Sequence, residues 1–254
     1  MTATPSRDPG TPSGHAGDRG NGASAGEVGA MFDRIAPRYD LMNALISGFQ
    51  EPRWRRRAIA ATGLRPGMTA IDVATGTGKV ARGLADRVGP FGRVVGVDVS
   101  TVMLDRARRA NADRVELAFV VGDALDLPIE DGIADAATIA FGMRNLPDYE
   151  RGFREMLRVV RPGGRVVCLE AARARSLPGR LGWLWFEHVV PMLGRLAGHA
   201  APYRYLVTSV AAYPAPEQIA EIMRRAGWAD VRWVPLTVGL VTIHTGRRRA
   251  DPPA

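Results

Sequence analysis

The end of the first strand-like run of this sequence and the residues that follow it have the residue types of a cofactor-binding turn. It reads Asp72-Val-Ala-Thr-Gly76-Thr77-Gly78 and leads into a predicted helix. Glycines permit a tight turn and let backbone N–H groups approach a ligand, while the N-terminus of a helix favours a carboxylate or a phosphate. Because Ala81 completes the spacing of a dinucleotide site, this turn alone does not decide between cofactors.

Two further acidic residues stand at the ends of the next two strand-like runs. Asp98 lies about 20 residues beyond the turn, where a carboxylate can accept hydrogen bonds from both ribose hydroxyls, as in NAD enzymes. Asp123 can accept one from the amino group of an adenine. Asp72 is a poor neighbour for a pyrophosphate and a good one for the ammonium of S-adenosylmethionine. Each acid alone could cap a helix or a turn, but three at successive strand ends favour S-adenosylmethionine as the cofactor.

The elements that position these residues alternate between strand-like and helix-like segments, which is typical of a parallel sheet covered by helices. Helices are predicted at 79–88, at 149–160 before Pro162-Gly-Gly164, and from Pro216 to Gly227. Strands are predicted at Thr69–Val73, Arg93–Asp98, Glu116–Val121, Ala134–Ile139, Arg165–Glu170, Val231–Leu236 and Gly239–His244. No helix separates the last two strands, so they form a hairpin or one of them runs antiparallel.

Length and composition predict one α/β domain over residues 26–250 of the 254 residues. Residues 1–25 are rich in Thr, Pro, Ser and Gly and carry too few apolar side chains to offset ordering entropy, so we expect a disordered tail. The sequence shows neither a signal-peptide pattern nor an apolar stretch suited to a bilayer. Cys168 is the only cysteine, which favours a reducing compartment. We therefore expect a cytoplasmic protein.

The formal net charge of +8 raises the question of a nucleic-acid partner. Almost all basic residues are arginines, which occur in short groups near acids, as at 55–57 and 247–249, without aromatic residues between them. This arrangement favours a solvated surface, or one that touches an anionic membrane, over nucleic acid. No His, Cys or Asp pair has the spacing of metal ligands, so no metal is expected.

Several motifs give the chain a resemblance to a known family. They are Phe32-Asp-x-Ile-Ala-x-x-Tyr39-Asp-x-Met-Asn43 followed by Ser47 and Trp54, Phe141-Gly-x-Arg144-Asn145, Arg158-Val-Val-Arg-Pro-Gly-Gly164 with Leu169-Glu170, Tyr203-x-Tyr-Leu-x-x-Ser209, and Leu236-Thr-x-Gly239 with Ile243-His244. On these motifs the chain resembles the class I S-adenosylmethionine-dependent methyltransferases. Within that class it resembles the family that methylates demethylmenaquinol and ubiquinone precursors at a ring carbon. The resemblance covers roughly 28–247, nearly all of the expected domain.

The resemblance implies a Rossmann-like α/β fold. Its sheet is mostly parallel and seven-stranded, with an antiparallel C-terminal strand and helices on both faces. Cofactor contacts carry over to Thr77, Asp98, Asp123 and Ala124. The chain departs from the family pattern at Glu51 and Pro52, where the family usually has His and Arg, and at Ala140 and Ala172, where it has Ser. Ala140 remains a candidate for the cofactor side but lacks that hydroxyl.

The implied reaction is C-methylation of demethylmenaquinol, a quinol with an isoprenoid tail. A ubiquinone precursor or a soluble phenol or polyketide is the alternative acceptor, and an NAD-dependent oxidoreductase is disfavoured. Arg144 and Asn145 follow the fourth predicted strand, at the carboxyl edge where such sheets bind ligands. Arg144 is a candidate anchor for a phenolate, with a structural ion pair as an equal alternative. Tyr39 is a candidate lid residue, or a buried aromatic residue of that lid.

An aromatic segment, Leu181–Leu193, is a candidate wall of an apolar slot for the isoprenoid tail, with Arg173, Arg175 and Arg180 facing lipid phosphates. An ordinary core helix is the alternative. The first interpretation predicts peripheral contact with the inner face of the cell membrane. The sequence leaves the oligomeric state open, a homodimer being one option. His188 and His244 lie on apolar segments and are expected to be packed rather than catalytic.

Overall fold

The computed structural model describes residues 46–174 and 200–250, apart from the side chains of 200–203, together with Gly26, Asp33, Ala44, Gly179, Gly182, Trp183 and Glu187. The expected tail, residues 1–25, and the candidate Tyr39 lie outside the described residues. No helix in the described part is both long and apolar enough to cross a membrane.

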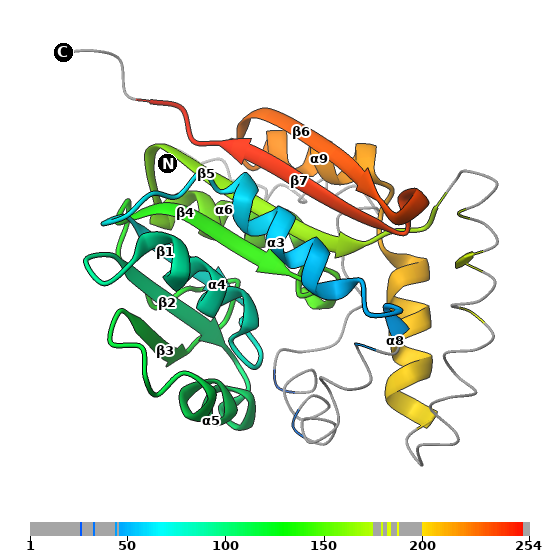
Figure 1. The fold of residues 1–254 in the computed structure, drawn as a ribbon. Helices are drawn as coiled ribbons and strands as arrows, with labels where there is room; N and C mark the ends of the chain where they lie inside the picture. Colours follow the sequence, from blue (N-terminus) through cyan, green and yellow to red (C-terminus); the bar gives the residue numbers. More distant parts are fainter. Residues whose placement is uncertain are drawn as a thin grey trace, which may run out of the picture.

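A seven-stranded sheet forms the centre of the described chain, in the order β3-β2-β1-β4-β5-β7-β6 (Figure 1). Its strands are β1 Thr69–Val73, β2 Arg93–Asp98, β3 Leu117–Val121, β4 Ala134–Ala140, β5 Val160–Ala171, β6 Ala229–Leu236 and β7 Val241–Arg247. The first five strands pair in parallel, and β7 runs antiparallel to both of its neighbours, β5 and β6. The predicted mostly parallel sheet with an antiparallel C-terminal strand is confirmed.

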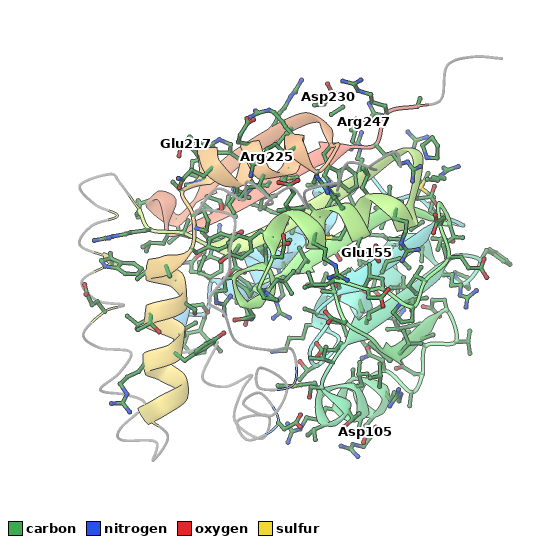
Figure 2. All side chains as sticks on the ribbon, turned by 180° about the vertical axis from the view of Figure 1, so that it is seen from behind. Asp105, Glu155, Glu217, Arg225, Asp230 and Arg247 are labelled. Carbon is green, nitrogen blue, oxygen red and sulfur yellow. The ribbon has the colours of Figure 1, made fainter. Side chains whose placement is uncertain are left out.

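Helices cover both faces of this sheet. They are α3 Glu51–Ala61, α4 Lys79–Val88, α5 Thr101–Ala110, α6 Tyr149–Val159, α8 Ala200–Ala212 and α9 Pro216–Arg225, with the 3₁₀ turns η1 Met143–Asn145 and η2 Thr237–Gly239. Figure 1 shows α3 and α4 on the near face, and Figure 2, from behind, shows α6 and α9 on the other. Since successive strand residues point to opposite faces, Ala70 packs in the cluster with α4 and Ile71 in the cluster with α6 and α9.

Several predicted boundaries shift by one or two residues, and those of β5 and β7 shift further. Pro162-Gly-Gly164 lies inside β5 rather than after a helix, because β5 already begins at Val160, which pairs with Ala134 across a register shift. The predicted strand Gly239–His244 begins instead at Val241. Thr237, Val238 and Gly239 have φ values of 45°, 52° and 93°, which an extended strand cannot accommodate.

Helices α3 and α8 were not among the predicted elements. α3 contributes few apolar residues of its own but buries Ala58 and Ile59 where it packs against α4 and β5. α8 lies at the carboxyl edge of the sheet, where it contacts η1 (Figure 1). Tertiary contacts with neighbouring elements therefore position both helices.

Candidate active site

Two cavities open at the carboxyl edge of the sheet. The strand-end cavity is lined by Ala74, Gly76, Asp98, Val99, Met103, Gly122, Asp123, Ala124, Ala140, Phe141, Gly142, Asn145, Leu146 and Pro147. The aromatic cavity is lined by Ile46, Ser47, Glu51, Trp54, Phe141, Arg144, Ala171, Ala172, Gly182, Trp183, Leu206, Val210, Thr237, Leu240 and Val241. Phe141 lines both, and the consecutive residues Arg144 and Asn145 line one cavity each. The short segment after β4 is therefore the shared boundary of the two cavities.

Asp98 at the end of β2 shapes one wall of the strand-end cavity. Its Oδ2 accepts a hydrogen bond from the backbone N–H of Gly76 at 2.8 Å, and its Oδ1 accepts one from that of Ser100 at 2.9 Å. Burial raises the pKa of Asp98, while these backbone bonds oppose the rise. Asp98 thus ties the glycine turn to the start of α5 and still presents its carboxylate to the cavity.

Ser100 and Asp33 lie next to Asp98 without lining the cavity, and the sequence assigns no individual role to either. The Ser100 hydroxyl accepts from the backbone N–H of Met103 at 3.0 Å, which caps α5. The same hydroxyl donates to the carboxylate of Asp33. Since Asp33 belongs to the first family motif, a described part of that motif lies beside Asp98. The N-cap pattern of Ser100 was readable in the sequence, but its contact with a residue far along the chain was not.

Asp123 and Ala124 line the same cavity at the end of β3. Asp123 Oδ1 accepts from the backbone N–H of Leu125 at 2.9 Å, so this acid closes its own turn as well as facing the cavity. Ala124 is 8% exposed. The structure therefore brings Asp98 and Asp123 together, as the strand-end argument predicted, with Gly76, Ala124 and Ala140 in the same cavity.

Asp72 lies differently. It is 1% exposed, and its two carboxylate oxygens accept hydrogen bonds from the hydroxyls of Thr75 and Thr138, both at 2.6 Å. Burial raises its pKa to about 6. Asp72, Thr77 and Gly78 are not among the described residues that line the strand-end cavity. A direct contact between Asp72 and the ammonium of S-adenosylmethionine therefore stays a prediction, whereas its contact with the turn through Thr75 is in the structure.

The two strand ends beside the cavity carry backbone strain. Ala74 after β1 has φ +51°, and Phe141 after β4 has φ +58°. Such values in non-glycine residues cost about 1–3 kcal/mol each and gather at functional sites. Gly142 lets the two ends meet, since a Cβ there would lie 2.6 Å from Cβ of Ala74. No sequence signal marks a non-glycine residue with positive φ, so sequence reasoning missed both.

Arg144 forms a buried ion pair and also lines the aromatic cavity. Its Nη1 lies 2.6 Å from Oε1 of Glu170 and donates to the carbonyl oxygen of Phe141 at 2.7 Å. The structural ion pair expected as one alternative for Arg144 is thus present. Because Arg144 also lines the cavity, its contact with a phenolate remains a proposal. Beside it, Asn145 Oδ1 accepts a hydrogen bond from the hydroxyl of Tyr205 at 3.1 Å, which links η1 to α8.

Aromatic rings form much of the second cavity. The ring centroids of Trp54 and Phe141 lie 6.2 Å apart, and Trp54 Nε1 donates to the hydroxyl of Thr237 at 2.8 Å. Trp183 lines the cavity as well, with the guanidinium carbon of Arg173 5.6 Å from its ring centroid. The structure describes only Gly182, Trp183 and Glu187 of the segment Leu181–Leu193, so His188 lies outside the described residues. The same holds for Arg175 and Arg180. Of the described residues of this segment, Gly182 and Trp183 line the cavity and Glu187 does not, and a slot for an isoprenoid tail stays a prediction.

The expectation of a packed His244 is confirmed. Its side chain is 0% exposed, its Nε2 lies 2.9 Å from the carbonyl oxygen of Pro216, and it stacks on Trp233. Burial lowers its pKa to about 4, so the ring is neutral near pH 7. His244 lines neither cavity. Its polar contact is with Pro216, the first residue of α9.

The strand-end cavity fits S-adenosylmethionine. Gly76 has φ +56°, and a Cβ built on it would meet no atom within 4 Å, so the backbone there borders open space that a ligand can approach closely. Asp98 and Asp123 stand at two successive strand ends of the same cavity, where they can accept hydrogen bonds from a ribose and an adenine. The residues present therefore match the cofactor that the sequence predicted.

Comparison with known proteins also indicates a methyltransferase. The family model described as the ubiE/COQ5 methyltransferase family matches residues 21–248. A demethylmenaquinone methyltransferase of Desulfitobacterium hafniense is 40% identical over 230 residues, which cover 88% of this chain and 90% of the relative. A demethylmenaquinone methyltransferase of Thermus thermophilus is 46% identical over 221 residues, which cover 86% of this chain and 100% of the relative.

A solved structure agrees on the fold. A SAM-dependent methyltransferase from Aquifex aeolicus superposes with a TM-score of 0.57 at 18% identity, covering 76% of this chain and 88% of the other. The expected Rossmann-like methyltransferase fold is confirmed. Family match, full-length relatives and fold lead to one conclusion: the chain belongs to the ubiE/COQ5 methyltransferase family.

Proposed function

We propose that this chain transfers the methyl group of S-adenosylmethionine to a ring carbon of a demethylmenaquinol. The similar proteins of Desulfitobacterium hafniense and Thermus thermophilus, both demethylmenaquinone methyltransferases, support this acceptor. The observation that carries the proposal is the shared boundary after β4, where Phe141 lines both cavities and Arg144 and Asn145 line one each. A ligand in the strand-end cavity and a ligand in the aromatic cavity would then meet across this short segment.

In this proposal the strand-end cavity holds the cofactor, which supplies an electrophilic methyl group when bound. Asp98 accepts hydrogen bonds from the ribose hydroxyls, and Asp123 accepts one from the adenine amino group. Gly76 lets the backbone approach the ligand. Asp72 keeps the turn in shape through Thr75. Each of these residues already has a protein partner that fixes its position, so the site is formed before the ligand arrives.

The aromatic cavity holds the acceptor. A quinol hydroxyl that has given its proton to water pushes electron density onto the adjacent ring carbon, which would take the methyl group and then lose its own hydrogen as a proton to water. Arg144 at the cavity wall would stabilise the phenolate oxygen. Glu170 holds the guanidinium in place. Little covalent chemistry is asked of the protein, because holding two reactants in line can by itself contribute about 7–11 kcal/mol. Tyr39 stays a prediction for a lid over the same site.

We assign the isoprenoid tail to the apolar part of this cavity, where Trp54, Trp183, Leu206 and Leu240 stand. A long apolar tail keeps the acceptor in the bilayer, so the proposal includes peripheral contact with the inner face of the membrane. Of the arginines predicted to face lipid phosphates, the structure describes Arg173, whose guanidinium lies over the ring of Trp183.

Labelled cofactor tests the proposal directly. The chain, labelled S-adenosylmethionine and a reduced prenylated naphthalene-1,4-diol should give a ring-methylated product, with a lower Michaelis constant than for the tailless diol. Trp183→Ala should raise that constant for the prenylated diol and hardly change it for the tailless one. Trp233→Ala, which lines neither cavity, is the control. Equal efficiency of the wild type on both diols would sink the membrane-quinol assignment and favour a soluble phenol.

A further inference from the structure

The aromatic cavity contains a second charged residue for which the proposed reaction has no role. Glu51, the first residue of α3, is 5% exposed and lines the cavity. Of the described residues in that lining, only Glu51 and Arg144 are charged. The remaining walls are aliphatic or aromatic apart from two hydroxyls and the backbone. Two opposite charges thus stand in one otherwise apolar space.

One oxygen of Glu51 is occupied and the other is available. Oε1 pairs with Nη2 of Arg55, one helical turn further along α3. Among the described residues Oε2 has no hydrogen-bond partner, yet it is not one of the polar atoms fully enclosed by protein. Oε2 therefore keeps some accessible surface, in a residue that lines the cavity. A carboxylate in such a place accepts hydrogen bonds and cannot donate any, and leaving it unpaired in an apolar site is costly.

We propose that Glu51 accepts a hydrogen bond from a hydroxyl of the methyl acceptor and so selects the reduced diol over the oxidised quinone. An aromatic diol ionised at one hydroxyl presents one anionic oxygen and one O–H group. The anionic oxygen suits Arg144, and the O–H group suits Glu51. A quinone offers two carbonyl oxygens, one of which would face the carboxylate with no proton between them. The inference rests on the proposed function, because it assigns the diol to the same cavity.

A purely structural role for Glu51 must be separated from this one. Glu51 lies in the first turn of α3 and pairs with the arginine four residues later, an arrangement that also supports an isolated helix. Glu150 offers a matched comparison, since it lies in the first turn of α6 and pairs with Arg154 four residues later. Glu150 lines neither cavity. Glu150→Gln therefore removes the corresponding helix contacts, and in addition an ion pair with Arg225 of α9, without touching the proposed site.

The test compares binding of the diol and the quinone. A prenylated naphthalene-1,4-diol kept reduced with dithionite, and the corresponding quinone, are titrated against wild type, Glu51→Gln and Glu150→Gln, with tryptophan quenching as the signal. The wild type should bind the diol at least about tenfold more tightly than the quinone, as expected for a hydrogen bond to a charged group. Glu51→Gln should reduce this preference at least about tenfold, largely by tightening the quinone, because the amide can donate to a carbonyl. Glu150→Gln should keep the preference of the wild type.

Two outcomes overturn the inference, and they differ in meaning. If Glu51→Gln retains the melting temperature and the preference of the wild type while the wild type methylates the diol, Glu51 has no such role and the proposed function stands. If the wild type neither binds nor methylates the diol, both fail together. Should Glu51→Gln not fold, the wild type alone decides through the two monomethyl ethers of the diol. Each should bind about tenfold more weakly than the diol, and an ether that binds equally well contradicts the inference.

Discussion

Nη1 of Arg144 lies 2.6 Å from Oε1 of Glu170, and neither side chain is more than 7% exposed. The same carboxylate accepts from the backbone N–H of Arg144 at 3.2 Å and from that of Ala171 at 2.9 Å. Glu170 at the end of β5 therefore fixes both the guanidinium and the backbone of η1. Since η1 is the boundary between the two cavities, this one acid positions the residues on either side of it.

Glu170→Gln should show how much this ion pair contributes to stability and to turnover. Removing one partner of a buried ion pair leaves the other charge uncompensated, which costs about 3–5 kcal/mol of unfolding free energy, measured by urea denaturation. The turnover number should fall while the affinity for S-adenosylmethionine changes little. Glu221→Gln is the control, because its ion pair with Arg224 is about half exposed and should contribute less than about 1 kcal/mol. Equal losses in the two variants would contradict the assigned role of Glu170.

Asp98→Ala should weaken cofactor binding. The change removes hydrogen bonds to the ribose and also releases the backbone N–H groups of Gly76 and Ser100. We expect a loss of at least about 1–3 kcal/mol, or roughly 5-fold to 150-fold in the dissociation constant, by isothermal titration. Asp105→Ala, on the exposed side of α5 (Figure 2), should bind as the wild type does. An unchanged constant in folded Asp98→Ala would refute the assignment.

Two glycines in the left-handed conformation should separate stability from binding. Gly67 has φ +84° and Gly76 has φ +56°, and a Cβ on either meets no atom within 4 Å. Alanine at each position should cost about 1–2 kcal/mol of stability, because the left-handed conformation opposes a Cβ. Gly76→Ala should in addition lose affinity for S-adenosylmethionine, since its Cβ would occupy cofactor space. If Gly67→Ala loses the same affinity, the loss comes from general destabilisation and not from the cavity.

His244 should make stability depend on pH. Its pKa is lowered from 6.5 to about 4 by burial, so the unfolded chain takes up a proton before the folded one does as the pH falls. The stability that the neutral ring contributes is present above pH 6.5 and is lost between pH 6.5 and 4, by up to about 3 kcal/mol.

His244→Phe should abolish that part of the slope, while losing about 1 kcal/mol at pH 7 with the hydrogen bond to Pro216. Asp72, with a pKa raised to about 6, has the opposite effect: its contribution is present below pH 3.8 and is lost as the pH rises through 6. Because Asp72 is present in the wild type and in His244→Phe, its effect cancels when the two are compared. The difference between their unfolding free energies, measured by urea denaturation at each pH, therefore gives the contribution of His244. Parallel pH profiles would show that the ring does not titrate as described.

Local patterns were enough to predict much of the fold. The bounds of β1, β2 and α4 agree with the prediction residue for residue, because each is a short run whose apolar spacing and flanking turn residues belong to neighbouring positions. The strand-end acids followed from the same logic, since parallel strands bring their carboxyl ends to one edge. Asp98 and Asp123 accordingly line one cavity.

Only the tertiary structure decided which neighbours these residues have. Asp72 was predicted at a strand end like the other two acids, yet it lies within β1 and is buried against Thr138 of the adjacent strand. The sequence likewise determined that Arg144 follows β4, but not that Glu170 of β5 lies against it. Nor did it show that Glu51 of α3 reaches the same cavity. The physical reason is that spacing along the chain controls local conformation, whereas pairing, burial and strain depend on residues that come together only when distant strands and helices pack.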